Sequence, residues 1–231
     1  MVRIVWLSGN SGAGKTFTGD YLQMLCGFHH IDGDELFWST TPEEKALFAA
    51  LVKAFDFWFE GSPAPPALWH PYIDLVLARV RAASAAHADV CVSLTVYNRE
   101  VRDYLRAHLP EHTFVVLRVT ASELIRRARV RFAEYAKARG QPFERAFEQA
   151  HSLPEGSYSD ADFESRTLAI MRGLQPLAAD EARCHEVDAD SGQPWAALHA
   201  LLGLPPPPAA IPVEQIAAVN YARFKAHAPQ Q

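Results

Sequence analysis

Residues Gly9 to Thr16 read GNSGAGKT, and this stretch decides the fold because it satisfies the pattern G-x-x-x-x-G-K-[ST]. It stands between a short apolar run, residues 2–8, and a helical pattern, residues 15–26, which is the context that the pattern requires. Glycines let such a loop turn its amide groups inward, where they and the following helix N-terminus bind phosphate. The alternative is a glycine-rich turn that caps a helix and carries an incidental lysine. The flanking strand and helix favour the phosphate site.

The loop predicts a site for ATP with a magnesium ion. We expect Lys15 to neutralise the β- and γ-phosphate oxygens, a catalytic role, and the Thr16 hydroxyl to ligate Mg²⁺. The residues expected to contact the nucleotide are Gly9, Asn10, Ser11, Gly12, Ala13, Gly14, Lys15, Thr16 and Phe17.

Strands and helices alternate along the rest of the chain. Expected strands cover residues 2–8, 28–31, 89–95, 113–119 and 186–189. Expected helices cover residues 15–26, 42–59, 73–86, 99–108, 120–138, part of 141–156, 163–174, 195–202 and 213–226. The alternation predicts a doubly wound α/β fold, in which helices cover both faces of a parallel sheet. The second strand is expected beside the first, so that both open onto one crevice beyond their carboxyl ends.

The length of 231 residues suits one main domain with a mobile lid. We place a P-loop domain at residues 1–204, with the lid at about 122–172. A proline-rich linker and a C-terminal helix are expected over residues 205–231, because Pro205 to Pro208 favour polyproline II.

Two carboxylates follow the second expected strand, in the segment Asp32-Gly33-Asp34. Residues two apart in extended chain point the same way, so both can face a bound phosphate. We expect Asp32 to hold Mg²⁺ and Asp34 to contact the acceptor and take the proton of its hydroxyl. The alternative is a turn with solvated acids. The strand at 89–95 carries no acid at its end, which makes these two aspartates more necessary.

Arginines gather on the helix that begins at Thr120, where Thr120 and Glu123 are spaced as a capping box. Arg127 and Arg131 are four residues apart and therefore share one face. A closing segment can bring such guanidinium groups onto the oxygens of a transferring phosphoryl group, so we expect both to be catalytic. The alternative is a solvated helix face paired with acids such as Glu123 and Glu134.

Two further side chains are candidates for acceptor binding. Arg102 lies in YNREVRDYLR, just past the third expected strand, where arginines can meet a substrate anion. His70 stands among Trp69, Pro71 and Tyr72, and it either contacts the acceptor or packs against these rings.

Composition narrows the class of partner. The formal net charge is −5, which argues against broad capture of nucleic acid, and a small-molecule acceptor is the expected partner. The 3 cysteines show no metal or disulfide spacing. No apolar stretch reaches membrane-spanning length, so we expect no membrane partner and a cytoplasmic location. We also expect a monomer or homodimer.

Several motifs together resemble one family. GNSGAGKT, FHHIDGDELF, VRDYLR, FVVL followed by ELIRRARVR, and HEVDAD are similar to the gluconate kinase family of small P-loop kinases, relatives of shikimate kinase and adenylylsulfate kinase. The likeness covers residues 1–38 and 89–131 well. It implies ATP and Mg²⁺ as cofactors and a sugar acid as one class of acceptor. The residues with implied roles are Gly12, Gly14, Lys15 and Thr16 for phosphate, Asp34 and Arg102 for the acceptor, and Arg127 and Arg131 for the lid.

The sequence also departs from that family. Gluconate kinases carry a histidine, an asparagine-containing stretch and an acidic-arginine motif after the aspartates, whereas residues 36–61 here read LFWSTTPEEKALFAALVKAFDFWFEG. Gluconate specificity therefore does not follow. Three interpretations remain: a kinase for a hydroxyl of a small metabolite, a nucleotide-binding regulatory switch with slow hydrolysis, and a nucleotide kinase.

Overall fold

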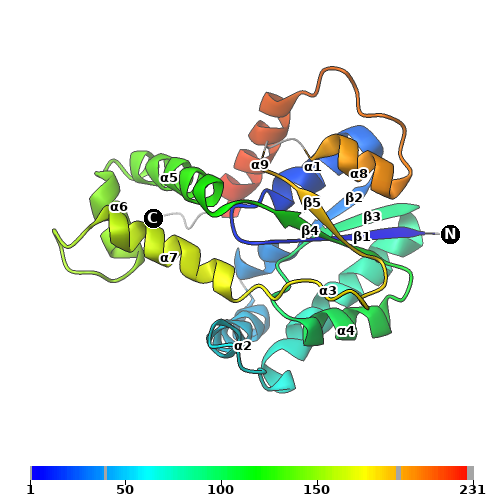
Figure 1. The fold of residues 1–231 in the computed structure, drawn as a ribbon, viewed down its shortest axis with the longest axis horizontal. Coiled ribbons are helices and arrows are strands. Elements are labelled where there is room, and N and C mark those ends of the chain that lie inside the picture. Colours follow the sequence, from blue (N-terminus) through cyan, green and yellow to red (C-terminus); the bar gives the residue numbers. More distant parts are fainter. Residues whose placement is uncertain (1, 39–40, 191–193, 228–231) are drawn as a thin grey trace.

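A five-stranded parallel sheet forms the centre of the molecule in a computed structural model, which describes residues 2–38, 41–190 and 194–227 (Figure 1). The last four residues of the expected C-terminal segment lie outside this range. The strand order is β2-β3-β1-β4-β5. The strands are β1 (Arg3–Ser8), β2 (His29–Asp32), β3 (Asp89–Ser93), β4 (Thr113–Arg118) and β5 (Cys184–Asp188). The expected doubly wound α/β class is confirmed.

The expectation that β2 lies beside β1 is wrong. β3 lies between them, with Val5 of β1 opposite Cys91, and His30 of β2 opposite the same Cys91 on its other side. Helix α1 (Lys15–Cys26) therefore crosses over β3 as it connects β1 to β2, and it contacts all three strands. The acids after β2 are consequently one strand further from the P-loop than the sequence suggested.

Helices cover both faces of the sheet because side chains alternate along each buried strand. Trp6 points to the face covered by α2 (Pro42–Phe59), α3 (Pro66–Ala86) and α4 (Arg99–His108). Its neighbours Val5 and Leu7 point to the other face, covered by α1, α8 (Trp195–Leu202) and α9 (Val213–His227). Fully buried Ile216 of α9 joins this second core, so the C-terminal helix packs as part of the fold.

Three helices form a lobe that projects from one side of the sheet (Figure 1). This helical lobe consists of α5 (Ala121–Ala138), α6 (Phe143–Ala150) and α7 (Asp160–Arg172). It has a small aromatic core of its own, in which Phe132, Phe147 and Phe163 meet at ring-centroid distances of 5.3 to 5.9 Å. The lobe contains the arginine-rich helix and coincides with the region expected as a lid.

Two local expectations need correction. Helix α3 begins at Pro66, seven residues before the expected start, and continues through Pro71. Pro71 is the sixth residue of the helix and lacks the N–H that would bond the Ala67 carbonyl, so α3 forgoes one hydrogen bond there. The second concerns the capping box: Glu123 N–H bonds the Thr120 hydroxyl at 3.4 Å, but Thr120 N–H bonds Asp190 instead of the Glu123 side chain.

Among the described residues, each helix is too short or insufficiently apolar to cross a lipid bilayer.

Candidate nucleotide and phosphoryl-transfer site

The loop between β1 and α1 has the backbone that its glycines predict. Gly9 has a φ of +136°, and a side chain there would come within 2.6 Å of the Leu117 carbonyl oxygen on β4. Gly14 caps α1 with a φ of +93°. Ala13 N–H donates to the Asn10 carbonyl and closes the turn, while the first amides of α1 lack intrahelical acceptors, as in every helix. The loop therefore presents donors to an anion at the helix N-terminus.

Lys15 lies inside this loop. Its ammonium donates to the Asn10 carbonyl at 3.0 Å, and the residue is only 6% exposed. Burial lowers the pKa of Lys15, an effect opposed by the nearby charges of Asp34 and Asp32. The lysine and the two aspartates thus form one electrostatic group, although β3 separates their strands.

The carboxylate of Asp32 is held by hydrogen bonds. Its Oδ1 accepts from Asp34 N–H at 3.0 Å and from the Ser93 hydroxyl at 3.3 Å. These bonds turn the chain sharply after β2 and place Asp34 in the short 3-10 helix Gly33–Trp38. The turn of the alternative interpretation is therefore present, but Asp32 is buried and not solvated as that interpretation expected.

Asp34 has a perturbed carboxyl group. Burial and the charge of Asp32 raise its pKa to about 6, against the opposing effects of Lys15 and Arg131. A carboxyl group with a pKa near that value is ionised at pH 7.5 and is still a useful proton acceptor. Of the residues near the P-loop, Asp34 thus best fits a general base.

Two buried tyrosines, Tyr72 and Tyr97, lie near the segment that carries Asp34. The Tyr72 hydroxyl of α3 donates to the Gly33 carbonyl at 2.6 Å. Tyr97 follows β3 and is 6% exposed, and burial together with the Asp34 charge raises its pKa. Both rings belong to the core beneath α2 and α3, so this core fixes the position of the Asp34 backbone. No sequence motif predicts a role for either tyrosine.

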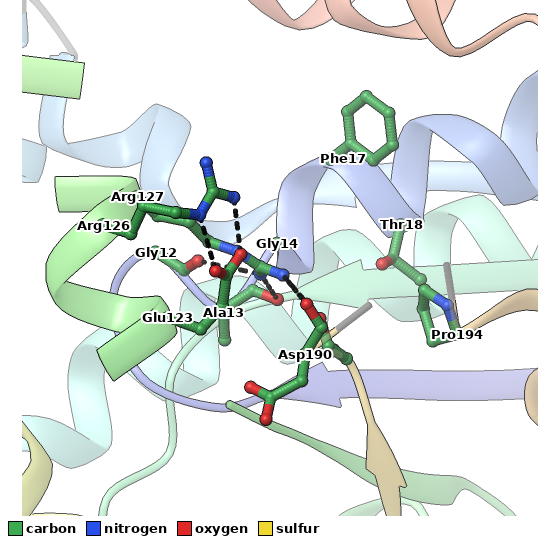
Figure 2. Close-up of a pocket in the computed structure, with 11 residues that line it drawn as sticks. Gly12, Ala13, Gly14, Phe17, Thr18, Glu123, Arg126, Arg127, Asp190 and Pro194 are labelled. Carbon is green, nitrogen blue, oxygen red and sulfur yellow. Dashed lines mark hydrogen bonds and ion pairs between the residues drawn. The ribbon is translucent and has the colours of Figure 1, made fainter. Parts of the chain in front are cut away.

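Arg127 lies across the P-loop, as Figure 2 shows. Its guanidinium joins the loop to the end of β5, and all of its nitrogen atoms have acceptors. These acceptors are the Glu123 carboxylate at 2.7 Å and the carbonyl oxygens of Gly12 at 3.4 Å, Ala13 at 3.3 Å, Ala189 at 2.5 Å and Asp190 at 3.3 Å. Such a guanidinium holds the loop in place.

Arg131 lies one turn further along α5 and contacts another part of the P-loop. Its guanidinium donates to the Ser11 hydroxyl at 3.4 Å and interacts electrostatically with Asp34 and Lys15. The two arginines that sequence reasoning treated as a pair are therefore placed differently. Arg127 contacts the P-loop backbone, whereas Arg131 faces the catalytic candidates.

A pocket of about 350 Å³ opens beside the P-loop (Figure 2). The sequence singled out part of its lining, the loop glycines with Phe17 and Arg127. It missed Thr18 of α1, Glu123 and Arg126 of α5, and Asp190 and Pro194 after β5. The position of Asp190 at the carboxyl end of a parallel strand could have identified it, because ligands bind there in doubly wound sheets.

Glu123 lines this pocket with a negative charge. Hydrogen bonds from Arg126 and Arg127 lower its pKa to about 2. Its carboxylate is thus paired with two guanidinium groups, while Thr120 N–H is bonded to Asp190.

Arg102 corrects a sequence-based expectation. The side chain is 1% exposed and bonds both oxygens of Glu181, at 2.7 and 2.8 Å, as well as the Gln175 and Pro176 carbonyls. It has no access to an acceptor and serves instead as a buried tie between α4 and the segment before β5. The partner lies 79 residues further along the chain, beyond the reach of local sequence patterns.

His70 also lies away from the acids. Its ring stacks on Tyr104 of α4 at a centroid distance of 4.2 Å and meets Trp69 edge-on. Tyr72 reaches Gly33 from another side of α3, because residues two apart on a helix point to different faces. The packing interpretation of His70 is therefore the one that the structure favours.

The donors available for a metal can be stated for the described residues. Within that part of the chain, no three His, Cys, Asp or Glu side chains gather as a metal cluster. Mg²⁺ in phosphoryl-transfer sites is held by one or two protein oxygens together with phosphate oxygens. The Thr16 hydroxyl and the Asp32 carboxylate, both oxygen ligands beside the phosphate loop, fit that kind of site.

The sheet order, the loop between β1 and α1, and the buried lysine define the α/β fold of P-loop nucleotide-binding proteins. No family model and no curated protein sequence matches the chain. Among solved structures, it is similar to a gluconokinase from Sinorhizobium meliloti 1021, with 20% identity, a TM-score of 0.46 and coverage of 98% of each chain. It is also similar to a sugar kinase from Janibacter sp. HTCC2649, with 19% identity, a TM-score of 0.43 and coverage of 100% of each chain. Neither structure bears on the site or the acceptor at these values.

Proposed function

We propose that this protein is an ATP-dependent kinase that transfers the γ-phosphoryl group to a hydroxyl of a small metabolite. The observation that carries the proposal is Asp34, whose raised pKa is coupled to the charges of Lys15 and Arg131 beside the phosphate loop. A carboxylate that lies within electrostatic reach of the phosphate-site lysine and keeps a raised pKa is suited to accept the proton of an acceptor hydroxyl.

The nucleotide is expected to occupy two parts of the site. Its phosphates would bind the amides of residues 9–16 and the Lys15 ammonium, and its base would occupy the pocket between Arg126 and Pro194. When bound, Mg²⁺ would neutralise charge on the β- and γ-phosphate oxygens, with Thr16 and Asp32 as the protein residues that hold it.

The protein's own residues supply the transfer chemistry. Asp34 accepts the proton of the acceptor hydroxyl, and Arg131 stabilises the charge that develops on the transferring group. Arg127 holds the P-loop carbonyls, and thereby the loop amides, in place.

The acceptor class is constrained by the arginines of α4. All three are paired with acids: Arg99 with Asp180, Arg102 with Glu181, and Arg106 with both Glu181 and Asp103. The carboxylate of a sugar acid therefore lacks the arginine contact that the gluconate kinase resemblance implied. We propose a hydroxylated metabolite as acceptor without the requirement that it be an acid.

A screen of ADP release tests the proposal. Purified protein with ATP and Mg²⁺ is assayed against neutral sugars and polyols, sugar acids, shikimate-like alcohols and nucleoside monophosphates. Turnover that depends on a hydroxyl compound, and that Asp34→Asn abolishes, supports the kinase. Hydrolysis that no acceptor stimulates would favour a regulatory switch, and stimulation by nucleoside monophosphates alone would favour a nucleotide kinase.

A further inference from the structure

A chain of buried polar side chains lies beneath the proposed magnesium ligand. His30 Nδ1 is 2.9 Å from the Asp20 carboxylate of α1, and His30 Nε2 is 2.9 Å from the Ser93 hydroxyl of β3. The Ser93 hydroxyl in turn donates to Asp32 Oδ1 at 3.3 Å. The side chains of His30 and Asp20 are fully buried. Three elements, α1, β2 and β3, thus converge on one carboxylate.

The sheet register explains why these groups meet. His30 and Asp32 are two residues apart on β2 and therefore point to the same face. Ser93 stands directly opposite Asp32 on β3. The serine hydroxyl is thus placed between the imidazole and the carboxylate by strand pairing.

A glycine in α1 accommodates the same imidazole. A side chain at Gly19 would come within 2.2 Å of His30 Nε2. Glycine in a helix interior weakens the helix relative to alanine, so its place here has a structural cost. That cost is explained if the position of the His30 ring matters.

Hydrogen bonds fix the orientation of the Asp32 carboxylate. The Ser93 hydroxyl has one proton, which it donates to Asp32 Oδ1; its oxygen then accepts from His30 Nε2, and one further proton lies between His30 Nδ1 and the Asp20 carboxyl group. Asp32 Oδ1 then receives two donors, Ser93 and Asp34 N–H, which fix the carboxyl plane. Groups that orient a metal-binding side chain commonly change metal affinity by 10- to 100-fold when removed, as an order of magnitude.

We propose that Asp20, His30 and Ser93 form a positioning relay that orients Asp32 for the metal of the nucleotide complex. The inference rests on the proposed function, in which Asp32 holds Mg²⁺. These three residues contact neither nucleotide nor acceptor and act through Asp32. Because Asn220 of α9 donates to the second Asp20 oxygen at 3.3 Å, the relay ends at the C-terminal helix.

Ser93→Ala is the main test. Calorimetry measures the ATP dissociation constant in Mg²⁺ and in excess EDTA, and the ratio of the two reports the contribution of the metal. Ser93→Ala is expected to reduce that ratio by up to about tenfold while the constant in EDTA stays unchanged. The matched control is Ser84→Ala on α3, where the hydroxyl has no partner among the described residues. It should leave both constants unchanged.

A pair of His30 variants separates positioning from packing. Asparagine places its amide near the Nδ1 position and keeps a donor for Asp20, whereas glutamine reaches the Nε2 position and keeps one for Ser93. Both lose packing, and circular dichroism melts identify the folded fraction. The relay predicts that His30→Gln retains more of the Mg²⁺-dependent affinity than His30→Asn, an order that loss of packing alone does not produce.

The outcomes distinguish the relay from the function on which it rests. A folded Ser93→Ala protein with the wild-type ratio, or equal ratios for His30→Gln and His30→Asn, would overturn the relay and leave the kinase proposal intact. Wild-type protein that binds ATP equally with and without Mg²⁺ would remove the metal role of Asp32, and the relay with it. Wild-type protein that binds no ATP would overturn the proposed function itself.

Discussion

The Arg102 guanidinium and the Glu181 carboxylate form a buried ion pair with two parallel bonds, which joins α4 to the segment before β5. Removal of Arg102 leaves the buried Glu181 carboxylate with the partly exposed Arg106 as its remaining ion-pair partner. We therefore expect Arg102→Ala to lower the free energy of unfolding by about 3–5 kcal/mol, measured by urea denaturation. The control Arg99→Ala breaks an exposed pair with Asp180 and should change the free energy of unfolding far less, because water screens exposed ion pairs. If Arg102→Ala left the free energy of unfolding unchanged and raised the KM for the acceptor, Arg102 would be an acceptor-binding residue after all.

The same pair predicts a dependence of stability on acid. Although burial opposes ionisation, hydrogen bonds from Arg102, Ala178 N–H and Arg106 lower the pKa of Glu181 to about 2. The folded carboxyl group therefore binds its proton at lower pH than the unfolded one. Its contribution is complete above about pH 4.5 and is lost as the pH falls toward 2. In melts over that range, Glu181→Gln should lose less stability than wild type; parallel curves would contradict the assignment.

Lys15→Ala should abolish tight ATP binding, because the loop loses the cation that faces the β- and γ-phosphates. Isothermal calorimetry provides the measurement. Lys53→Ala on the exposed side of α2 is a suitable control, since it removes an equal charge far from the loop. Wild-type affinity in Lys15→Ala would contradict the phosphate assignment.

Asp34→Asn should leave ATP binding largely intact and abolish acceptor-dependent turnover, as expected for a general base. In wild type, turnover should fall as the pH drops through about 6, because Asp34 becomes protonated. An unchanged rate in the variant would assign the base to another group.

The same substitution, Asp34→Asn, should stabilise the folded protein although it abolishes turnover. The raised pKa of Asp34 means that its charge disfavours the folded state above pH 6, by up to about 3 kcal/mol. Asp34→Asn should therefore raise the Tm at pH 8. The gain should disappear below about pH 4, where wild type is protonated in both states. A variant that is less stable at pH 8 would show that the Asp34 charge stabilises the fold.

Arg131→Ala should lower kcat by roughly 10²- to 10³-fold with little change in ATP affinity, because its guanidinium faces Asp34 and acts on developing charge. Arg127→Ala should mainly weaken ATP binding, since Arg127 holds the P-loop carbonyls. Arg139→Ala, at the exposed end of α5, serves as the control. Equal loss of kcat in Arg127→Ala and Arg131→Ala would contradict their different placement.

Local patterns predicted those parts of the fold that depend on local physics. The start of α2 follows from Thr41, whose hydroxyl caps the helix, and from the N1 proline Pro42. The P-loop follows from glycines that adopt positive φ angles. Strand order could not be read in the same way, because the insertion of β3 between β1 and β2 depends on pairing across the whole sheet.

The residues of the candidate site also differ in whether local patterns could indicate them. Lys15 and Asp34 could be proposed because a motif or a strand end placed them, and Arg131 because it shares a helix face with Arg127. Arg102 was misassigned because its partner Glu181 lies far along the chain. The roles of Ser93 and His30 depend on register between β2 and β3, which no spacing in the sequence records.

The aromatic core of the helical lobe has a mechanical consequence. Phe132 of α5 packs against Phe147 of α6 and Phe163 of α7, so the three helices resist bending relative to one another. Arg127 and Arg131 lie one turn apart on this stiff unit. A hinge movement at its ends would displace both guanidinium groups together, and closure over nucleotide and acceptor would then be a single event.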